Sequence, residues 1–405
     1  MIRPSFIAAC LLTFTALIGC ATGPNAADSG ANFNSSAGSL IIAGGGTERD
    51  NAAIWGRFIK LAAGRKIGIA ATASGVADEA AANCREALLL HGATPEQVIE
   101  LPLRQGDTAS ADSPATVALI DGLGAVWFTG GDQSRITATL MSAGADRPAL
   151  MAMRNLIGKR KGVIGGTSAG AAMMSEMMLA NGTSDRWLTT LLNDPKAELP
   201  LERGIGFAPN FVTDQHFFAR GRTGRLAAAL TSGDIKTGIG IDENRAVLVD
   251  LATQTVEGIG NQAALVLYAG DTAAKAGTVG PLTAWLLGDG DTVLFTPTIP
   301  VVTPATGSRV YFDAASPGTP RPRQTAVKPR PAGAATGPFD KEVIPDLLIS
   351  SMYRPMSEPA VAADTKWKLT VARDASTLLV GEGPAMRIFG VRLTISRVGT
   401  PAVQR

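Results

Sequence analysis

Alternation of apolar runs with helix-forming segments constrains the fold of this chain more than any other feature. Unbroken apolar runs recur after residue 38, and helical segments separate them. The expected strands are 39–43, 66–71, 97–101 and 125–129, and the expected helices are 76–91, 113–123 and 134–144. Continuous apolar strands are typical of parallel sheets that are buried on both faces. The pattern predicts an α/β fold with a doubly wound, mostly parallel sheet and helices on both faces.

The segment 162–177 predicts a strand, a tight turn and a helix. Its centre, Gly166-Thr167-Ser168-Ala169-Gly170, fits the pattern G-x-S-x-G of a nucleophile elbow. Small flanking residues let the backbone turn sharply and expose the serine hydroxyl above the edge of a sheet. Ser168 is therefore the candidate nucleophile. The alternative is a glycine-rich turn that only allows close packing.

Histidine is scarce, with two residues in the whole chain. If an imidazole activates Ser168, it belongs to His91 or His216. His91 precedes Gly92 at the end of a predicted helix, where a C-cap role accounts for it. His216 follows a short predicted strand and lies among polar residues, as expected of a base carried on a loop. His216 is therefore the preferred candidate base.

Composition and motifs argue against several classes of function. A net charge of +2, without an aromatic-basic repeat, gives no reason to expect a nucleic-acid partner. The glycine-rich segment 44–49 lacks the third glycine of a dinucleotide fingerprint, and no P-loop motif is present. No Cys/His cluster has the spacing of a metal site. We therefore expect neither a cofactor nor a metal.

The N-terminus predicts export. Arg3 precedes an apolar stretch, 6–18, that is shorter than the roughly 20 residues of a membrane-spanning helix. The stretch ends in Leu17-Ile18-Gly19-Cys20, which resembles the bacterial lipobox, where cleavage exposes the cysteine for acylation. We expect Cys20 to carry a lipid that anchors the exported protein to the bacterial cell envelope. This lipid is the only membrane attachment that we expect. The alternative is an ordinary secretory signal, cleaved for example after Ala21.

The 405 residues exceed one typical domain. The expected organisation is a lipoprotein signal peptide (1–20), a flexible tether (21–38), a catalytic domain (39–295), a proline-rich linker (296–340) and a β-rich accessory segment (341–405). Without the leader, and with Cys20 lipidated, Cys84 is the remaining cysteine, so no internal disulfide is expected.

Three motifs together carry a family resemblance. They are the elbow at 165–171, the segment Phe128-Thr129-Gly130-Gly131-Asp132-Gln133, and Asp214-Gln215-His216-Phe217 followed by three arginines. In order and spacing they resemble the cyanophycinase family of serine peptidases, over about residues 39–275. The resemblance implies a flavodoxin-like sandwich, similar to class I glutamine amidotransferases and commonly dimeric. It also implies exopeptidase cleavage of cyanophycin, a polyaspartate that carries arginine on each side chain, to β-Asp-Arg dipeptides.

The resemblance also implies roles for individual residues. Ser168 is the nucleophile and His216 the general base, while backbone amides of Gly131 and Ala169 serve the oxyanion. The implied substrate-binding residues are Gln133, Asp214, Gln215, Arg220, Arg222 and Arg225. Arginine side chains suit substrate carboxylates, and acidic or amide groups suit a guanidinium.

The third member of the triad is expected shortly after the elbow helix, where the family has a glutamate behind a turn rich in glycine and serine. The equivalent turn here is 181–186, and Asp185 is its carboxylate. An aspartate can also orient an imidazole, so Asp185 is the predicted third residue. Glu176 and Glu198 remain alternatives.

Other functions stay open. An aspartyl dipeptidase of the same family is the nearest alternative, although the arginine cluster and Asp214-Gln215 favour the polymer-degrading branch. An α/β-hydrolase esterase would have an HGGG-type oxyanion loop and a later histidine, and the sequence has neither. A non-catalytic exported binding lipoprotein would explain the tether but gives no reason for Ser168 to occupy an elbow.

Overall fold

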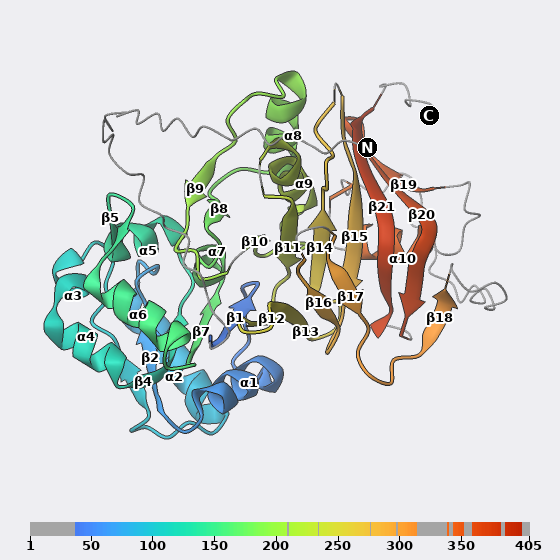
Figure 1. The fold of residues 1–405 in the computed structure, drawn as a ribbon. Helices are drawn as coiled ribbons and strands as arrows, with labels where there is room; N and C mark the ends of the chain where they lie inside the picture. Colours follow the sequence, from blue (N-terminus) through green and yellow to red (C-terminus); the bar gives the residue numbers. More distant parts are fainter. Residues whose placement is uncertain are drawn as a thin grey trace, which may run out of the picture. The chain divides into compact units, whose positions relative to one another are not determined.

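Two large β-sheets carry the fold (Figure 1). The structure is a computed structural model and describes residues 37–208, 210–233, 235–275, 277–296, 299–313, 338–339, 343–351, 359–381 and 385–398. The predicted signal peptide with Cys20, and the predicted tether up to residue 36, lie outside these residues. Within them, no helix combines the length and the apolar character needed to cross a membrane.

The first sheet has the order β17-β16-β13-β12-β1-β7-β4-β2-β3. One half is parallel and comprises β1 (Ser39–Ala43), β7 (Val163–Thr167), β4 (Leu123–Phe128), β2 (Lys66–Ala70) and β3 (Val98–Glu100). The other half adds antiparallel strands, namely β12 (Ala246–Asp250), β13 (Thr255–Ile259), β16 (Thr292–Leu294) and β17 (Val301–Thr303). The parallel half contains the strands that the apolar runs predict.

Helices cover both faces of the parallel half. On one face, α1 (Ala52–Ala62) and α2 (Ala77–Leu90) pack against a cluster that includes Ile41 and Trp127. On the opposite face, α4 (Pro114–Asp121), α5 (Gln133–Leu140) and α6 (Pro148–Gly158) contribute to a cluster with Leu40 and Ile42, as does the short α3 (Thr108–Asp112). Successive β1 residues point to opposite faces, so both faces need cover. The predicted doubly wound α/β fold is confirmed.

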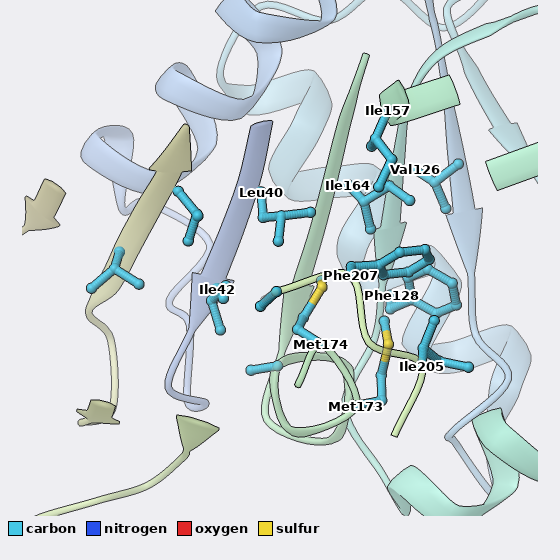
Figure 2. Packing of buried hydrophobic residues seen from close by; sticks show 14 of the residues in the cluster. Leu40, Ile42, Val126, Phe128, Ile157, Ile164, Met173, Met174, Ile205 and Phe207 are labelled. Atoms are coloured by element: carbon cyan, nitrogen blue, oxygen red, sulfur yellow. The ribbon is translucent and has the colours of Figure 1, made fainter. Parts of the chain in front are cut away.

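The cluster on the second face also lies beneath the elbow. Figure 2 shows Leu40, Ile42, Val126, Phe128 and Ile164 of the strands near Met173 and Met174, which directly follow α7 (Ala169–Ala172). All of these side chains are fully buried. The apolar packing therefore fixes the position of the turn between β7 and α7.

The second sheet has the order β10-β11-β14-β15-β21-β20-β18, and β19 also pairs with β20. Its strands are β10 (Val212–Asp214), β11 (Thr237–Ile241), β14 (Ala264–Tyr268), β15 (Thr278–Leu287), β18 (Val310–Asp313), β19 (Ala360–Ala363), β20 (Trp367–Val380) and β21 (Arg387–Arg397). Figure 1 shows β14, β15, β21 and β20 side by side. The predicted β-rich C-terminal segment is present, and its strands extend this sheet. Most of the predicted linker, residues 314–337, lies outside the described residues.

Three helices pack against the second sheet, namely α8 (Ser184–Asn193), α9 (Thr223–Ser232) and α10 (Val343–Ser350). Two small antiparallel pairs complete the described elements. They are β5 (Met141–Ser142) with β6 (Ala145–Asp146), and β8 (Met177–Leu179) with β9 (Leu201–Arg203).

One predicted helix is shorter than expected. Helix α5 ends at Leu140 instead of continuing to Gly144, and the chain turns back as the β5–β6 hairpin. Ala143 and Gly144 both have positive φ, 47° and 81°. Such angles at both central residues suit a tight hairpin and are incompatible with a helix.

A buried ion pair joins the two sheets. Asp291, between β15 and β16, is fully buried, and its carboxylate lies 2.7 Å from Arg387 Nε of β21. The same carboxylate accepts hydrogen bonds from the backbone N–H groups of Gly288 and Ala305. Arg387 also donates to Ser308 Oγ. The pair thus connects β21 to the loops at one end of the first sheet.

Arg387→Leu should lower the free energy of unfolding by about 3–5 kcal/mol, because Asp291 would remain buried without its cation. Urea unfolding followed by circular dichroism measures the change. Lys368→Leu, at an exposed position on β20, is the matched control and should stay within about 0.5 kcal/mol of the parent protein. Equal stability of Arg387→Leu and the control would contradict the inferred role of the ion pair.

Candidate active site

Ser168 lies at the predicted elbow between β7 and α7, with φ 54° and ψ −110°. A non-glycine residue rarely adopts this conformation, which is typical of a nucleophile elbow. The flanking glycines are sterically required. A Cβ on Gly166 would lie 2.4 Å from the carbonyl oxygen of Gly170, and a Cβ on Gly170 would lie 2.6 Å from that of Phe128. The G-x-S-x-G pattern therefore reflects close contacts within the turn.

Ser168, His216 and Glu243 form a continuous hydrogen-bonded chain. Ser168 Oγ lies 2.8 Å from His216 Nε2, and His216 Nδ1 lies 2.6 Å from Glu243 Oε1. His216 follows β10 and Glu243 follows β11, the parallel neighbour of β10. The structure thus brings together Ser168 and His216, the two residues that the sequence predicts as nucleophile and base.

The last residue of β1 and the two glycines that follow it hold the loops that carry Ser168, His216 and Glu243. Three successive carbonyl oxygens accept backbone hydrogen bonds: Ala43 from Ser168 (3.1 Å), Gly44 from His216 (2.6 Å), and Gly45 from Asn244, next to Glu243 (2.8 Å). A Cβ on Gly45 would lie 2.4 Å from His216 Nε2. The backbone at Gly44 and Gly45, directly after β1, therefore positions the imidazole.

Burial keeps the imidazole of His216 available as a base. Desolvation lowers the pKa of His216 below its ordinary value, the hydrogen bond to Glu243 acts in the opposite direction, and the nearby Arg220 adds to the lowering. A lowered pKa leaves the ring neutral at neutral pH, with one nitrogen free to accept a proton. A hydrogen bond to Glu243 requires the proton on Nδ1, so Nε2 faces the serine as the acceptor.

The structure places Asp185 away from His216, and this corrects the predicted third residue. Asp185 lies in the first turn of α8, where its carboxylate accepts a hydrogen bond from Trp367 Nε1 (2.7 Å) and pairs with Lys366 Nζ (2.5 Å). These contacts, the bond to Lys366 foremost, lower the pKa of Asp185. Glu243 takes the position on His216 Nδ1 instead. Both alternatives, Glu176 and Glu198, are exposed.

The sequence does contain a signal for Glu243. It follows the apolar strand 237–241, and His216 follows the strand 212–214. When two strands are parallel neighbours, the residues that follow them meet at the same edge of the sheet. The position of Asp185 in the turn after the elbow helix favours it in the sequence, whereas the pairing of β10 with β11 brings Glu243 to His216.

Of the two predicted oxyanion residues, Ala169 directly follows Ser168, and Gly131 follows Gly130, which lies near Ser168. Ala169 is the first residue of α7, where a backbone N–H has no partner within the helix. Gly131, with φ 145°, follows Gly130, where an added Cβ would lie 3.4 Å from Ser168 Cβ. A Cβ on Gly131 would lie 2.1 Å from the carbonyl oxygen of Ala73, so the loop after β4 passes close to that backbone.

Three of the predicted substrate-binding residues contact one another. Asp214 is 1% exposed and Arg225 is equally buried. Arg225 Nε donates to Asp214 Oδ2 at 2.8 Å, and Arg225 Nη2 pairs with Asp214 Oδ1. Arg222 Nη1 lies 3.5 Å from Asp214 Oδ1 and donates to the carbonyl oxygen of Gln215 (2.5 Å). Burial lowers the pKa of Arg222 to about 10. These side chains hold the loop that carries His216.

The remaining predicted binding residues differ in their surroundings. Gln133 Nε2 donates to the carbonyl oxygens of Leu179 and Ala180, so its amide nitrogen has partners within the protein. Gln215 is buried, and its Oε1 accepts no hydrogen bond from the described residues. Arg220 is exposed. Within this set, Arg220 presents an exposed guanidinium, and Gln215 Oε1 is a buried acceptor without a donor from the described residues.

His91 and Cys84, which the sequence analysis also considered, make contacts of their own. His91 Nε2 lies 2.9 Å from the carbonyl oxygen of Arg49, an exposed contact. Cys84 is buried in α2, and burial raises the pKa of its thiol. Across the part of the chain that the structure describes, no group of three or more His, Cys, Asp or Glu residues has the arrangement of a metal site.

Gly45→Ala should slow the reaction of Ser168 with a fluorophosphonate probe by about 10²-fold, because the new methyl group would displace the imidazole. Intact-protein mass spectrometry measures the labelling rate. Gly64→Ala is the matched control: Gly64 also has positive φ, 74°, but a Cβ there meets nothing within 4 Å. Unchanged labelling of Gly45→Ala would show that the backbone of β1 does not position the ring.

Comparisons with known proteins indicate the family of this chain. Residues 40–256 match the model of peptidase family S51. The cyanophycinase of Synechococcus elongatus is 34% identical over 145 residues, which make up 36% of this chain and 42% of that protein. The cyanophycinase of Geminocystis herdmanii is 38% identical over 120 residues, 30% of this chain and 40% of that protein. The chain thus spans about two-fifths of the length of these relatives.

Among solved structures, the crystal structure of a peptidase from an acI-B1 Actinobacterium aligns with 68% of this chain and 97% of its own, at 18% identity. Its TM-score of 0.42 is too low to support an argument. The family match covers more than half of the chain and contains Ser168, His216 and Glu243. The chain therefore belongs to peptidase family S51, the serine-type peptidase family that its motifs predict.

Proposed function

We propose that this protein is an exported serine exopeptidase that hydrolyses cyanophycin to β-Asp-Arg dipeptides. The observation that carries the proposal is the hydrogen-bonded chain from Ser168 through His216 to Glu243, built on an elbow with positive φ. Such a chain serves acyl transfer, because it supplies a nucleophile, a base and a carboxylate that orients the base. The similarity to cyanophycinases supports the choice of substrate. The lipobox-like sequence before Cys20 supports export with a lipid anchor.

In the proposed acylation step, Ser168 Oγ attacks the carbonyl carbon of the scissile amide. His216 Nε2, 2.8 Å away, takes the hydroxyl proton and becomes an imidazolium. Glu243 stabilises the imidazolium through the 2.6 Å contact with Nδ1. The imidazolium then donates its Nε2 proton to the leaving amine, and an acyl ester remains on Ser168.

Deacylation follows the same path with water as the nucleophile. His216 Nε2 accepts a proton from the water as the water attacks the acyl ester. His216 then donates this proton to Ser168 Oγ as the ester bond breaks, and the carboxylate product is released. Both tetrahedral intermediates carry a negative oxygen, for which we assign the backbone N–H groups of Gly131 and Ala169. Donors fixed on the backbone stabilise this charge without reorganisation during the reaction.

Two groups near His216 suit the chemistry of the substrate. The exposed guanidinium of Arg220 can pair with a substrate carboxylate. Gln215 Oε1 is buried without a donor from the described residues, and an N–H of a bound peptide would satisfy it. Asp214 and Arg225 instead neutralise each other, so we assign them the role of positioning the loop.

Incubation of the purified protein with insoluble cyanophycin tests the proposal. We expect clearing of the polymer and release of β-Asp-Arg, detected by liquid chromatography and mass spectrometry. Ser168→Ala should lower the rate by at least about 10³-fold. Parallel incubations with simple esters and with α-aspartyl dipeptides separate an esterase from a dipeptidase. Cleavage of either one without clearing of the polymer would refute the proposed substrate.

Glu243→Gln should reduce kcat by about 10²–10⁴-fold, because a neutral amide stabilises the imidazolium of His216 poorly and does not enforce its tautomer. Steady-state kinetics on a soluble aspartyl-arginine substrate measures the change. Glu198→Gln, an equivalent substitution at an exposed position, should leave kcat unaltered. Full activity of Glu243→Gln together with an inactive Asp185→Asn would assign the third role to Asp185.

A further inference from the structure

A cleft of about 430 Å³ opens beside the loop that carries His216. Three segments line it: the start of α8 with Thr183 and Asp185, the loop with Arg220, and the C-terminal segment with Phe339 and 364–367. The last segment lies outside residues 40–256, which match the family model. The cleft is therefore bounded partly by the peptidase domain and partly by strands that this chain adds to it.

The wall on the peptidase side is fixed to the catalytic loop. The backbone N–H of Arg220 donates to the carbonyl oxygen of His216 at 3.0 Å. Ser184 Oγ of α8 donates to the carbonyl oxygen of Gly221. Arg220 is also close enough for its charge to act on the pKa of His216. One side of the cleft therefore begins at Arg220, whose backbone is bonded to that of the proposed base, His216.

The opposite wall is the turn that leads into β20. Asp364 Oδ1 accepts hydrogen bonds from the backbone N–H groups of Lys366 (2.7 Å) and Trp367 (2.6 Å), so the turn is locally fixed. Trp367 Nε1 and Lys366 Nζ both contact the carboxylate of Asp185. These two contacts hold the C-terminal wall against α8, and Trp367, 2% exposed, is anchored in the core below.

The cleft presents charges of both signs to solvent. Arg220 and Lys366 are positive, and Asp185 and Asp364 are negative. All four residues are exposed. Arg220 forms no ion pair within the described part of the chain, whereas Lys366 is paired with Asp185. A ligand that fits the cleft therefore carries a carboxylate, which pairs with Arg220, and a cationic group, which pairs with Asp185 and Asp364. A peptide unit of aspartate with arginine on its side chain offers a free carboxylate and a guanidinium.

We propose that this cleft is a second substrate subsite, which binds the peptide unit next to the one held at Ser168. The ligand class is a peptide whose units each carry a carboxylate and a guanidinium. The carboxylate pairs with Arg220, and the guanidinium lies between Asp185 and Asp364. The proposal rests on the proposed peptidase function and extends it, because the turn 364–367 would make the protein prefer long substrates over single units.

Binding measured on Ser168→Ala protein tests the subsite without turnover. The probes are a synthetic tri-aspartate that carries arginine on each side chain and the single aspartyl-arginine unit. Isothermal titration calorimetry should give the three-unit probe an affinity about tenfold higher or more. Thr365→Lys adds a positive charge that opposes the bound guanidinium, and Thr365→Trp fills the cleft; neither substitution removes a described contact. Thr303→Lys, at an exposed position outside the cleft, is the matched control.

We expect Thr365→Lys and Thr365→Trp each to remove the gain of the three-unit probe and to change the single-unit affinity less than about twofold. The control should bind both probes as the parent does. Thermal unfolding of each variant checks that it folds. The subsite would be overturned if the parent protein bound both probes equally well or bound neither. It would also be overturned if the two cleft variants lost affinity for both probes to the same extent.

Hydrolysis of the three-unit probe by the protein with Ser168 intact is measured separately. Length-dependent binding that the cleft variants abolish, without any hydrolysis, would refute the peptidase function and leave the subsite standing. Hydrolysis with length-independent binding would refute the subsite alone.

Discussion

The end of β1 is the point on which the rest of the site depends. Its consecutive carbonyl oxygens at Ala43, Gly44 and Gly45 accept hydrogen bonds from the loops that contain Ser168, His216 and Glu243. These loops come from distant parts of the chain, and each follows a different strand. Backbone bonds to the end of one strand and to the two glycines after it fix these loops with little freedom, which is how a hydrogen-bonded triad keeps its geometry before a substrate arrives.

Space around β1 is as restrictive as its hydrogen bonds. A Cβ on Gly44 would lie 2.2 Å from the carbonyl oxygen of Asp242, and a Cβ on Gly45 would enter the ring of His216. The glycines after β1 look like the start of a nucleotide loop in the sequence. In the structure their small size lets two catalytic loops approach the same backbone.

Sequence patterns predicted the layered core well because apolar periodicity and burial have the same cause. The predicted strand 66–71 and helix 76–91 agree with β2 and α2 within about one residue at each end. Ser168 and His216 were identifiable because the elbow restricts its residue types and histidine is rare. Glu243 was missed because its contact arises from the pairing of β10 with β11, which no local pattern encodes. The three arginines look alike in the sequence, yet Arg225 is buried, Arg222 is partly buried and Arg220 is exposed.

The order of strands in the second sheet has a consequence for how the protein is made. Strand β21 lies between β15 and β20, although β20 precedes it in the chain. During synthesis, β20 can pair at once with β18 and β19, which precede it, but it joins β15 only after β21 has emerged. Ser168, His216, Glu243 and the strand that holds them precede all of these residues. Ser168, His216 and Glu243 are thus synthesised first and the outer wall of the cleft last, so under the proposed subsite, changes confined to the later-made strands would alter the preferred substrate length and spare the chemistry.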